Sequence, residues 1–167
     1  MRFQAGSGEK TLATLLSLAL YPLRIGFVHS SGIIDHLLFC FCHANVFHLL
    51  GNLFFMWVMK IPLRIIPSFI ISFMCSFIPS PIMWDFKEIE TCGLSGVLFA
   101  SLGMAWGKVG DFRKMSRYVL VPVLIYGLIP KMNFLMHVYC LLLGYIYETS
   151  KSYLQERDGW NPFRRFL

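Results

Sequence analysis

The chain has 167 residues, of which 56% are hydrophobic and 16% aromatic, whereas only 14% are charged. Soluble domains average about 45–50% apolar and about 25% charged residues, so this composition excludes an ordinary soluble protein and predicts a one-domain polytopic membrane protein. The formal net charge of +6 would suit nucleic-acid binding, but the basic residues stand between apolar runs, as cytosolic membrane flanks do, and no nucleic-acid partner is expected.

Six hydrophobic segments follow one another along the chain and predict six membrane helices. They cover 11–28 with an interruption near residue 22, and about 46–59, 65–79, 94–106, 118–129 and 134–147. Several are shorter than the roughly 20 residues that a membrane helix usually needs, so we expect polar helix termini buried in protein, or a locally thinned bilayer. The sequence therefore predicts an all-α, six-helix membrane domain over 1–150 and a short polar cytosolic tail over 151–167.

The distribution of basic residues predicts how this bundle is oriented. If the N-terminus lies in the cytosol, only Arg24, Lys87 and Lys131 fall outside, which leaves 12 of the 15 Lys and Arg residues inside. The positive-inside rule favours that orientation, with both termini in the cytosol. The second, fourth and sixth segments then all enter the membrane from the outer side.

Polar residues gather at the starts of these three segments. The second begins near His43, His48 and Asn52, the fourth begins at Ser95, and the sixth carries His137 in its first turn. The topology therefore predicts that all of them lie at one depth, just below the outer surface. The loop before the second segment also contains His29 and His36, which we expect to be solvated loop residues.

Ser95 and His137 could form a nucleophile and its base. A serine hydroxyl attacks poorly until a base removes its proton, and neutral histidine is the usual base near neutral pH. Gly93 and Gly96 flank Ser95, and glycines allow a tight turn and close approach of another chain. The alternative is that Ser95 only packs helices and His137 bonds a backbone carbonyl, although ionisable residues inside spans are candidates for function by default.

His48 and Asn52 stand four residues apart and so share one helix face. Each can aim an N–H group at a common point, as a developing oxyanion requires. His43 need not share that face, and we expect a structural role for it. Ordinary hydrogen bonding between helices is the alternative for all three residues.

A metal site is a competing interpretation of the three histidines and Cys42. Zinc hydrolases commonly contain His-Glu-x-x-His, in which the histidines are four apart and the glutamate is the base. Here His43 and His48 are five apart, and no carboxylate stands in the spans near the site. We therefore expect no metal and no cofactor.

Two further features belong to the fourth segment. Gly96, Ala100 and Gly103 form a stripe of small residues, which favours close helix packing. Phe99 follows Ser95 by about one turn, so its ring could stack on His137 or could be an ordinary core or lipid-facing aromatic.

Taken together, these motifs resemble those of the rhomboid intramembrane serine proteases, of the compact six-helix bacterial form. Residues 43–52 fit the pattern His-x-x-x-x-His-x-x-x-Asn, residues 93–96 fit Gly-x-Ser-Gly, and His137 falls in the expected final span. The family often has a Trp-Arg pair near the position of Ile34 in the first loop, and usually a glycine at the position of Cys140. The resemblance covers roughly 41–144.

The resemblance implies that Ser95 is the nucleophile and His137 the base, without an acidic third member. It also implies an oxyanion hole built from His48, Asn52 and the Ser95 backbone N–H. His43 would order the loop over the site, and Phe99 stands in the place of a tyrosine that stacks on the base.

We therefore expect an endopeptidase that cleaves the transmembrane segments of other membrane proteins near the outer leaflet, in a bacterial inner membrane. The partners would be these substrates and the lipid bilayer. One alternative is a catalytically silent relative that binds or escorts membrane helices. Another is a small transporter or channel, which would place polar residues at the midplane of several spans.

Overall fold

The computed structural model describes residues 7–21, 23, 25–26, 28, 30–58, 63–79, 90–109, 116 and 133–159. The predicted fifth segment at 118–129 lies outside the described residues, as do His29 and residues 80–89 before the fourth segment. Statements about what the structure contains refer to this part of the chain.

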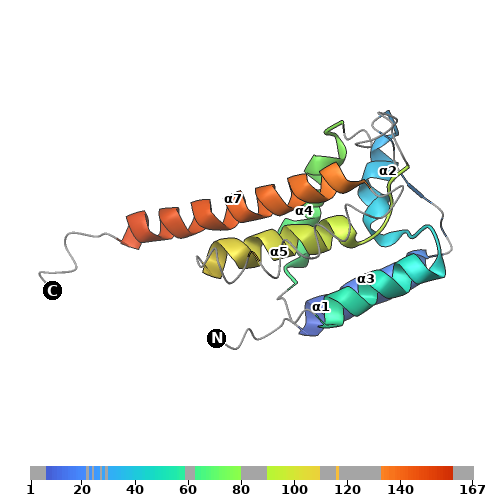
Figure 1. Ribbon diagram of the computed structural model, residues 1–167, viewed down its shortest axis with the longest axis horizontal. Helices are drawn as coiled ribbons and strands as arrows, with labels where there is room; N and C mark the ends of the chain where they lie inside the picture. The colour runs from blue at the N-terminus through green and yellow to red at the C-terminus, as the bar shows by residue number, and fades with distance from the viewer. Residues whose placement is uncertain are drawn as a thin grey trace, which may run out of the picture.

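The fold is all-α, as the sequence predicts. The elements, in chain order, are α1 (Ser7–Leu20), α2 (Ile33–Leu38), the short 3-10 helix η1 (Phe39–Phe41), α3 (Val46–Val58), α4 (Ile65–Ser76), α5 (Ser95–Val109) and α7 (Phe134–Gly159). Five of these helices begin within or beside the predicted hydrophobic segments. Helix α7 runs beyond the predicted end of the sixth segment, where good helix formers such as Glu148, Lys151 and Leu154 continue it. Its C-terminal half projects away from the other helices (Figure 1).

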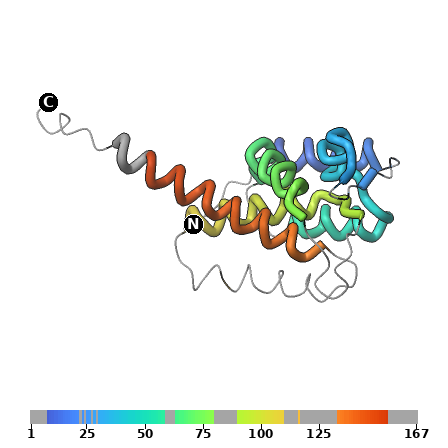
Figure 2. Tube along the Cα trace, turned by 90° about the horizontal axis from the view of Figure 1, so that it is seen from above, coloured from blue at the N-terminus to red at the C-terminus, as the bar shows by residue number. Residues whose placement is uncertain are grey.

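Helix α5 forms the centre of the bundle. Every residue from Ser95 to Ala105 is buried, and α5 lies alongside α7 in both views (Figures 1 and 2). The two backbones touch, because a Cβ atom at Gly103 would collide with the carbonyl oxygen of Leu141, and one at Gly144 with that of Ala100. Close packing of α5 on α7 is thus achieved with Cys140 fully buried on α7 in place of a glycine.

The outer helices present apolar side chains to the surroundings. Helix α3 exposes a row of large hydrophobic residues, namely Val46, Phe47, Leu50, Phe54, Trp57 and Val58. Helix α4 does the same with Ile66, Ile70 and Met74. Apolar side chains that cover the outside of a bundle are suited to contact with lipid rather than with water.

Among the described residues, no single helix is long and apolar enough to cross a bilayer alone. The segments Ile33–Phe41 and Val46–Val58 meet that requirement together, with a bend of 68° between them, by length and composition only.

The first loop holds a helix that the sequence analysis did not predict. Helix α2 turns His36 into the interior, where its side chain is fully buried. The prediction that His36 is a solvated loop residue is therefore wrong. Its Nδ1 lies 2.8 Å from the Ser76 hydroxyl, and its ring stacks on Phe77 with 4.2 Å between centroids. A helix of six residues with a polar residue on its buried side is too short to show a hydrophobic periodicity in the sequence.

Candidate active site

Ser95 and His137 form a buried hydrogen-bonded pair. The Ser95 Oγ lies 2.7 Å from His137 Nε2, and only 4% and 3% of the two residues is exposed. Ser95 is the first residue of α5, and His137 stands in the first turn of α7. The starts of two adjacent helices therefore bring the two side chains together, at a distance that allows direct proton transfer.

The turn before Ser95 requires a glycine at position 93. Gly93 has a φ of 113°, a left-handed backbone conformation that residues other than glycine rarely adopt. Its N–H donates to the Phe39 carbonyl oxygen at 2.8 Å, which ties the turn to η1. A Cβ atom here would come within 2.6 Å of His48 Cε1 and 3.2 Å of Asn52 Nδ2.

The same geometry shows where His48 and Asn52 point. Both side chains reach the backbone just before Ser95, from one face of α3. His48 Nε2 and both polar side-chain atoms of Asn52 are buried without a hydrogen-bond partner among the described residues. Buried polar atoms are rarely left in this condition, and donors held beside a nucleophile suit the binding of an oxyanion.

Asn45 sets the start of α3 and was not singled out from the sequence. Its Oδ1 accepts a hydrogen bond from the His48 backbone N–H at 2.9 Å. This is the contact of a helix N-cap, which satisfies one of the free donors in the first turn. An Asn directly before an apolar helical run is the sequence signal that would have identified it.

His43 joins the loop before α3 to the loop before α5. Its Nδ1 lies 3.2 Å from the Phe41 carbonyl oxygen, which can only accept. Nδ1 therefore carries the proton, and Nε2 accepts the Leu94 N–H at 3.5 Å. His43 thus contacts the residue next to Ser95 rather than the dyad itself.

Phe99 and Gly96 stand three residues apart on the nucleophile's helix and both contact α7. The Phe99 ring contacts His137, with centroids 4.8 Å apart and a tilt of 53° rather than parallel stacking. Gly96 faces α4 and α7, where a Cβ atom would collide with the Ser72 hydroxyl and lie 3.2 Å from Met136 Cε. Both residues fix the surroundings of the dyad through packing.

Asn133 and Thr91 hold the start of α7 and were also missed from the sequence. Asn133 Oδ1 accepts the Met136 N–H at 3.2 Å, as an N-cap does. Its Nδ2 donates to the Thr91 hydroxyl at 2.8 Å, and both residues are buried. Thr91 precedes Ser95 by four residues, so this bond couples the positions of the two helix starts.

Two nearby groups are poor alternatives as nucleophiles. Burial, assisted by the charge of Glu90 and by Cys42, raises the pKa of Cys92 to about 11, so this thiol stays protonated near neutral pH. Ser76 also bonds a histidine, but it donates its own proton to the Phe73 carbonyl oxygen at 2.6 Å. His36 must then be the donor to Ser76 and cannot act as its base.

A cavity of about 220 Å³ opens on the loop side of the site. It is lined by residues of the segments before α3 and α5, among them His43, Ala44, Glu90 and Cys92. Among the described residues, no group of three or more His, Cys, Asp or Glu side chains is arranged to hold a metal ion.

Comparison with protein-family models matches residues 31–152 to the Rhomboid domain. The matched range contains every residue of the site described above. No curated protein and no solved structure matches the chain.

Proposed function

The chain belongs to the rhomboid family, and from this premise we propose that it is an intramembrane serine endopeptidase with Ser95 as nucleophile and His137 as base. The family is a membrane family whose members are generally serine proteases, although inactive members exist. The observation that carries the proposal is the buried hydrogen bond of 2.7 Å between Ser95 Oγ and His137 Nε2.

The reaction begins with proton transfer. His137 Nε2 accepts the Ser95 proton while Oγ bonds to the carbonyl carbon of the scissile peptide, and the carbonyl oxygen becomes an oxyanion. His137 then gives the proton to the leaving amine, and the C–N bond breaks. Water hydrolyses the resulting ester with His137 again as base, which restores Ser95.

We assign the binding of this oxyanion to the side chains of His48 and Asn52. Both side chains reach the backbone beside Gly93 and have buried polar atoms without partners among the described residues. The Ser95 backbone N–H, at the N-terminus of α5, is assigned as a further donor. Fixed donors at this point stabilise the transition state without having to reorganise during the reaction.

Hydrolysis in a membrane protein also requires a route for water. We assign this route to the cavity on the loop side, because His43 on its wall contacts the backbone next to Ser95. Substrates are assigned as transmembrane segments of other proteins. Such a helix must unwind locally to present its scissile bond, which favours helix-breaking or small residues at the cleavage site.

We propose the orientation that the basic residues favour, with both termini in the cytosol and the dyad toward the outer face of a bacterial inner membrane. The shared position of Ser95, His137 and His48 in the first turns of α5, α7 and α3 is consistent with it.

The decisive test is cleavage of a generic transmembrane reporter in liposomes by the purified full chain. Wild type should cleave, and Ser95→Ala should not. A wild-type protein that binds the reporter but never cleaves it would instead establish the alternative, a silent relative that binds or escorts membrane helices. Ser76→Ala is a matched control, because its hydroxyl also bonds a histidine yet is assigned no role in the reaction.

A further inference from the structure

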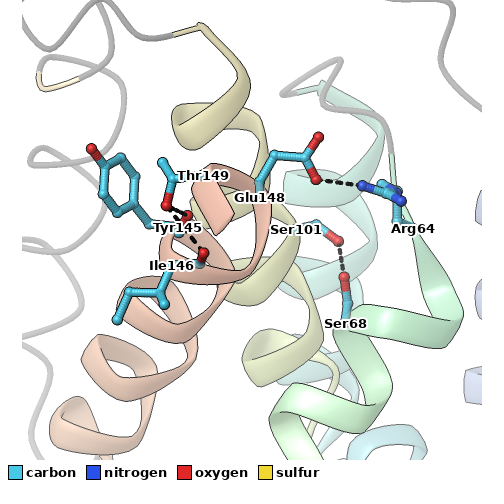
Figure 3. A network of polar contacts seen from close by, with 7 residues as sticks. All are labelled: Arg64, Ser68, Ser101, Tyr145, Ile146, Glu148 and Thr149. Atoms are coloured by element: carbon cyan, nitrogen blue, oxygen red, sulfur yellow. Dashed lines mark hydrogen bonds and ion pairs between the residues drawn. The ribbon is translucent and has the colours of Figure 1, made fainter. Parts of the chain in front are cut away.

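A second polar cavity, of about 260 Å³, lies at the end of the bundle opposite Ser95. Its lining comes from the start of α4, from α5 and from the middle of α7, three segments that Figure 3 shows side by side. Its charged lining consists of Arg64, Lys108, Lys151 and Glu148, with Ser101 among its polar groups. None of these residues belongs to the proposed active site.

The charges in this cavity do not balance. Glu148, which is 7% exposed, forms an ion pair with Arg64 through one terminal guanidinium nitrogen at 2.6 Å. Lys108 and Lys151 have no carboxylate partner among the described residues. Glu148 therefore neutralises one cation and leaves two, which favours an anionic ligand.

Side-chain contacts between helices hold the walls of this cavity in place. Ser101 and Ser68 form a buried hydrogen bond of 2.6 Å between α5 and α4, and the Arg64–Glu148 pair links α4 to α7 beside it (Figure 3). The guanidinium of Arg64 additionally lies 5.9 Å from the ring centroid of Tyr147. These contacts fix Arg64 while the guanidinium keeps further N–H donors for another acceptor.

The surroundings of the cavity distinguish a lipid from a free anion. Lys108 stands thirteen positions after Ser95 on α5, a rise of about 20 Å. With the dyad toward the outer face, as proposed above, the cavity therefore lies toward the opposite leaflet. Ile66, Tyr147 and Leu154 flank the charged residues along the chain and are 69%, 41% and 53% exposed. A ligand with an anionic headgroup and acyl chains would satisfy both the charged cavity and this apolar rim.

We propose that this cavity binds the phosphate group of an anionic phospholipid in the leaflet opposite the active site. Basic pockets between membrane helices on the cytoplasmic side bind anionic headgroups in this way. Arg64, Lys108 and Lys151 contact the phosphate, and the acyl chains lie along the exposed apolar residues of α4 and α7. The bound lipid joins α4, α5 and α7 and so stabilises the folded chain.

The proposal is tested by the thermal stability of the full chain in non-ionic detergent, titrated separately with four probes. These are dihexanoyl phosphatidylglycerol, dihexanoyl phosphatidylcholine, glycerol phosphate and inorganic phosphate. A ligand that binds only the folded state raises the melting temperature in a concentration-dependent way, from which its affinity follows. Phosphatidylglycerol should bind most tightly, and added salt should weaken it.

The variant Lys108→Gln/Lys151→Gln should lose about 30-fold in affinity for phosphatidylglycerol, because each lysine near an anionic surface contributes about a fivefold factor. The control Arg164→Gln/Arg165→Gln removes the same charge from the tail and should keep the wild-type affinity. Equal affinities of the lysine variant and wild type, or equal losses in the two variants, would overturn the site. Inorganic phosphate binding as tightly as phosphatidylglycerol would overturn the lipid as its ligand. None of these outcomes depends on proteolysis.

Discussion

Asn133 donates from its side-chain amide to the hydroxyl of Thr91 at 2.8 Å, which joins the residue before α7 to the segment before α5. His137 follows Asn133 by one helical turn, and Ser95 follows Thr91 by four residues. The bond therefore lies close to the dyad along both segments and couples the positions of Ser95 and His137.

Removing this coupling should slow the reaction without removing any reacting group. We expect Thr91→Val, which breaks the bond but keeps the N-cap oxygen of Asn133, to lower kcat with KM little changed. Asn133→Ala should in addition lose about 1 kcal/mol of unfolding free energy, because the helix cap is lost. Reporter kinetics and melting temperatures measure the two effects. Unchanged kcat in Thr91→Val would leave Asn133 with a capping role alone.

A fluorophosphonate probe should label the wild type covalently at Ser95, since it requires only an activated hydroxyl. Labelling should vanish in Ser95→Ala and fall steeply in His137→Ala, because a serine without its base keeps its proton. In-gel fluorescence measures the extent of this labelling. Chelators should change neither labelling nor cleavage, and restoration of a chelator-inhibited enzyme by zinc would contradict the dyad.

The oxyanion donors should affect rate rather than folding. Asn52→Ala should lower turnover by about 10²–10³-fold, which is the usual effect of losing one such donor. The substitution removes polar atoms that have no partner among the described residues, so the melting temperature should change little. Wild-type turnover in Asn52→Ala, in a His48 variant and in the double variant would remove both residues from this role.

Cys92 should be unreactive at neutral pH although it stands three residues before Ser95. Burial and the neighbouring groups raise the pKa of Cys92 to about 11, so the reactive thiolate is scarce at pH 7.5. At pH values below this pKa, the thiolate fraction increases about tenfold for each unit by which the pH rises. Mass spectrometry after brief iodoacetamide treatment at pH 7.5 and 9.5 should show this increase. Cys92→Ser should still cleave the reporter, and rapid alkylation at pH 7.5 would contradict the raised pKa.

The orientation predicts where tags are reported. Tags at Met1 and Leu167 should both lie in the cytosol, and a tag in the loop near Lys87 should lie outside, as accessibility to a membrane-impermeant reagent will show. A C-terminus outside the cell would place the dyad at the other face and contradict the proposed site of cleavage.

The sequence predicted the all-α fold and the boundaries of several helices because hydrophobic runs and glycine-flanked polar residues are local signals. The topology expected from the basic residues placed Ser95, His137, His48 and Asn52 at one depth, and in the structure Ser95 bonds His137 while His48 and Asn52 lie beside Gly93. Loop conformation has no such signal. The burial of His36, the helix around it and the bond between Asn133 and Thr91 depend on contacts between segments tens of residues apart, which neither periodicity nor spacing encodes.

The backbone contacts at Gly103 and Gly144 have a consequence for motion. With carbonyl oxygens of each helix pressed against a glycine of the other, α5 and α7 cannot slide or tilt against one another without a steric clash. We therefore expect Ser95 and His137 to move together, and any opening that admits a substrate to come from the helices packed around this pair. We expect substitutions on that outer layer to be tolerated, whereas a methyl group added at either glycine, about two turns from the dyad, should disturb the alignment of Ser95 with His137.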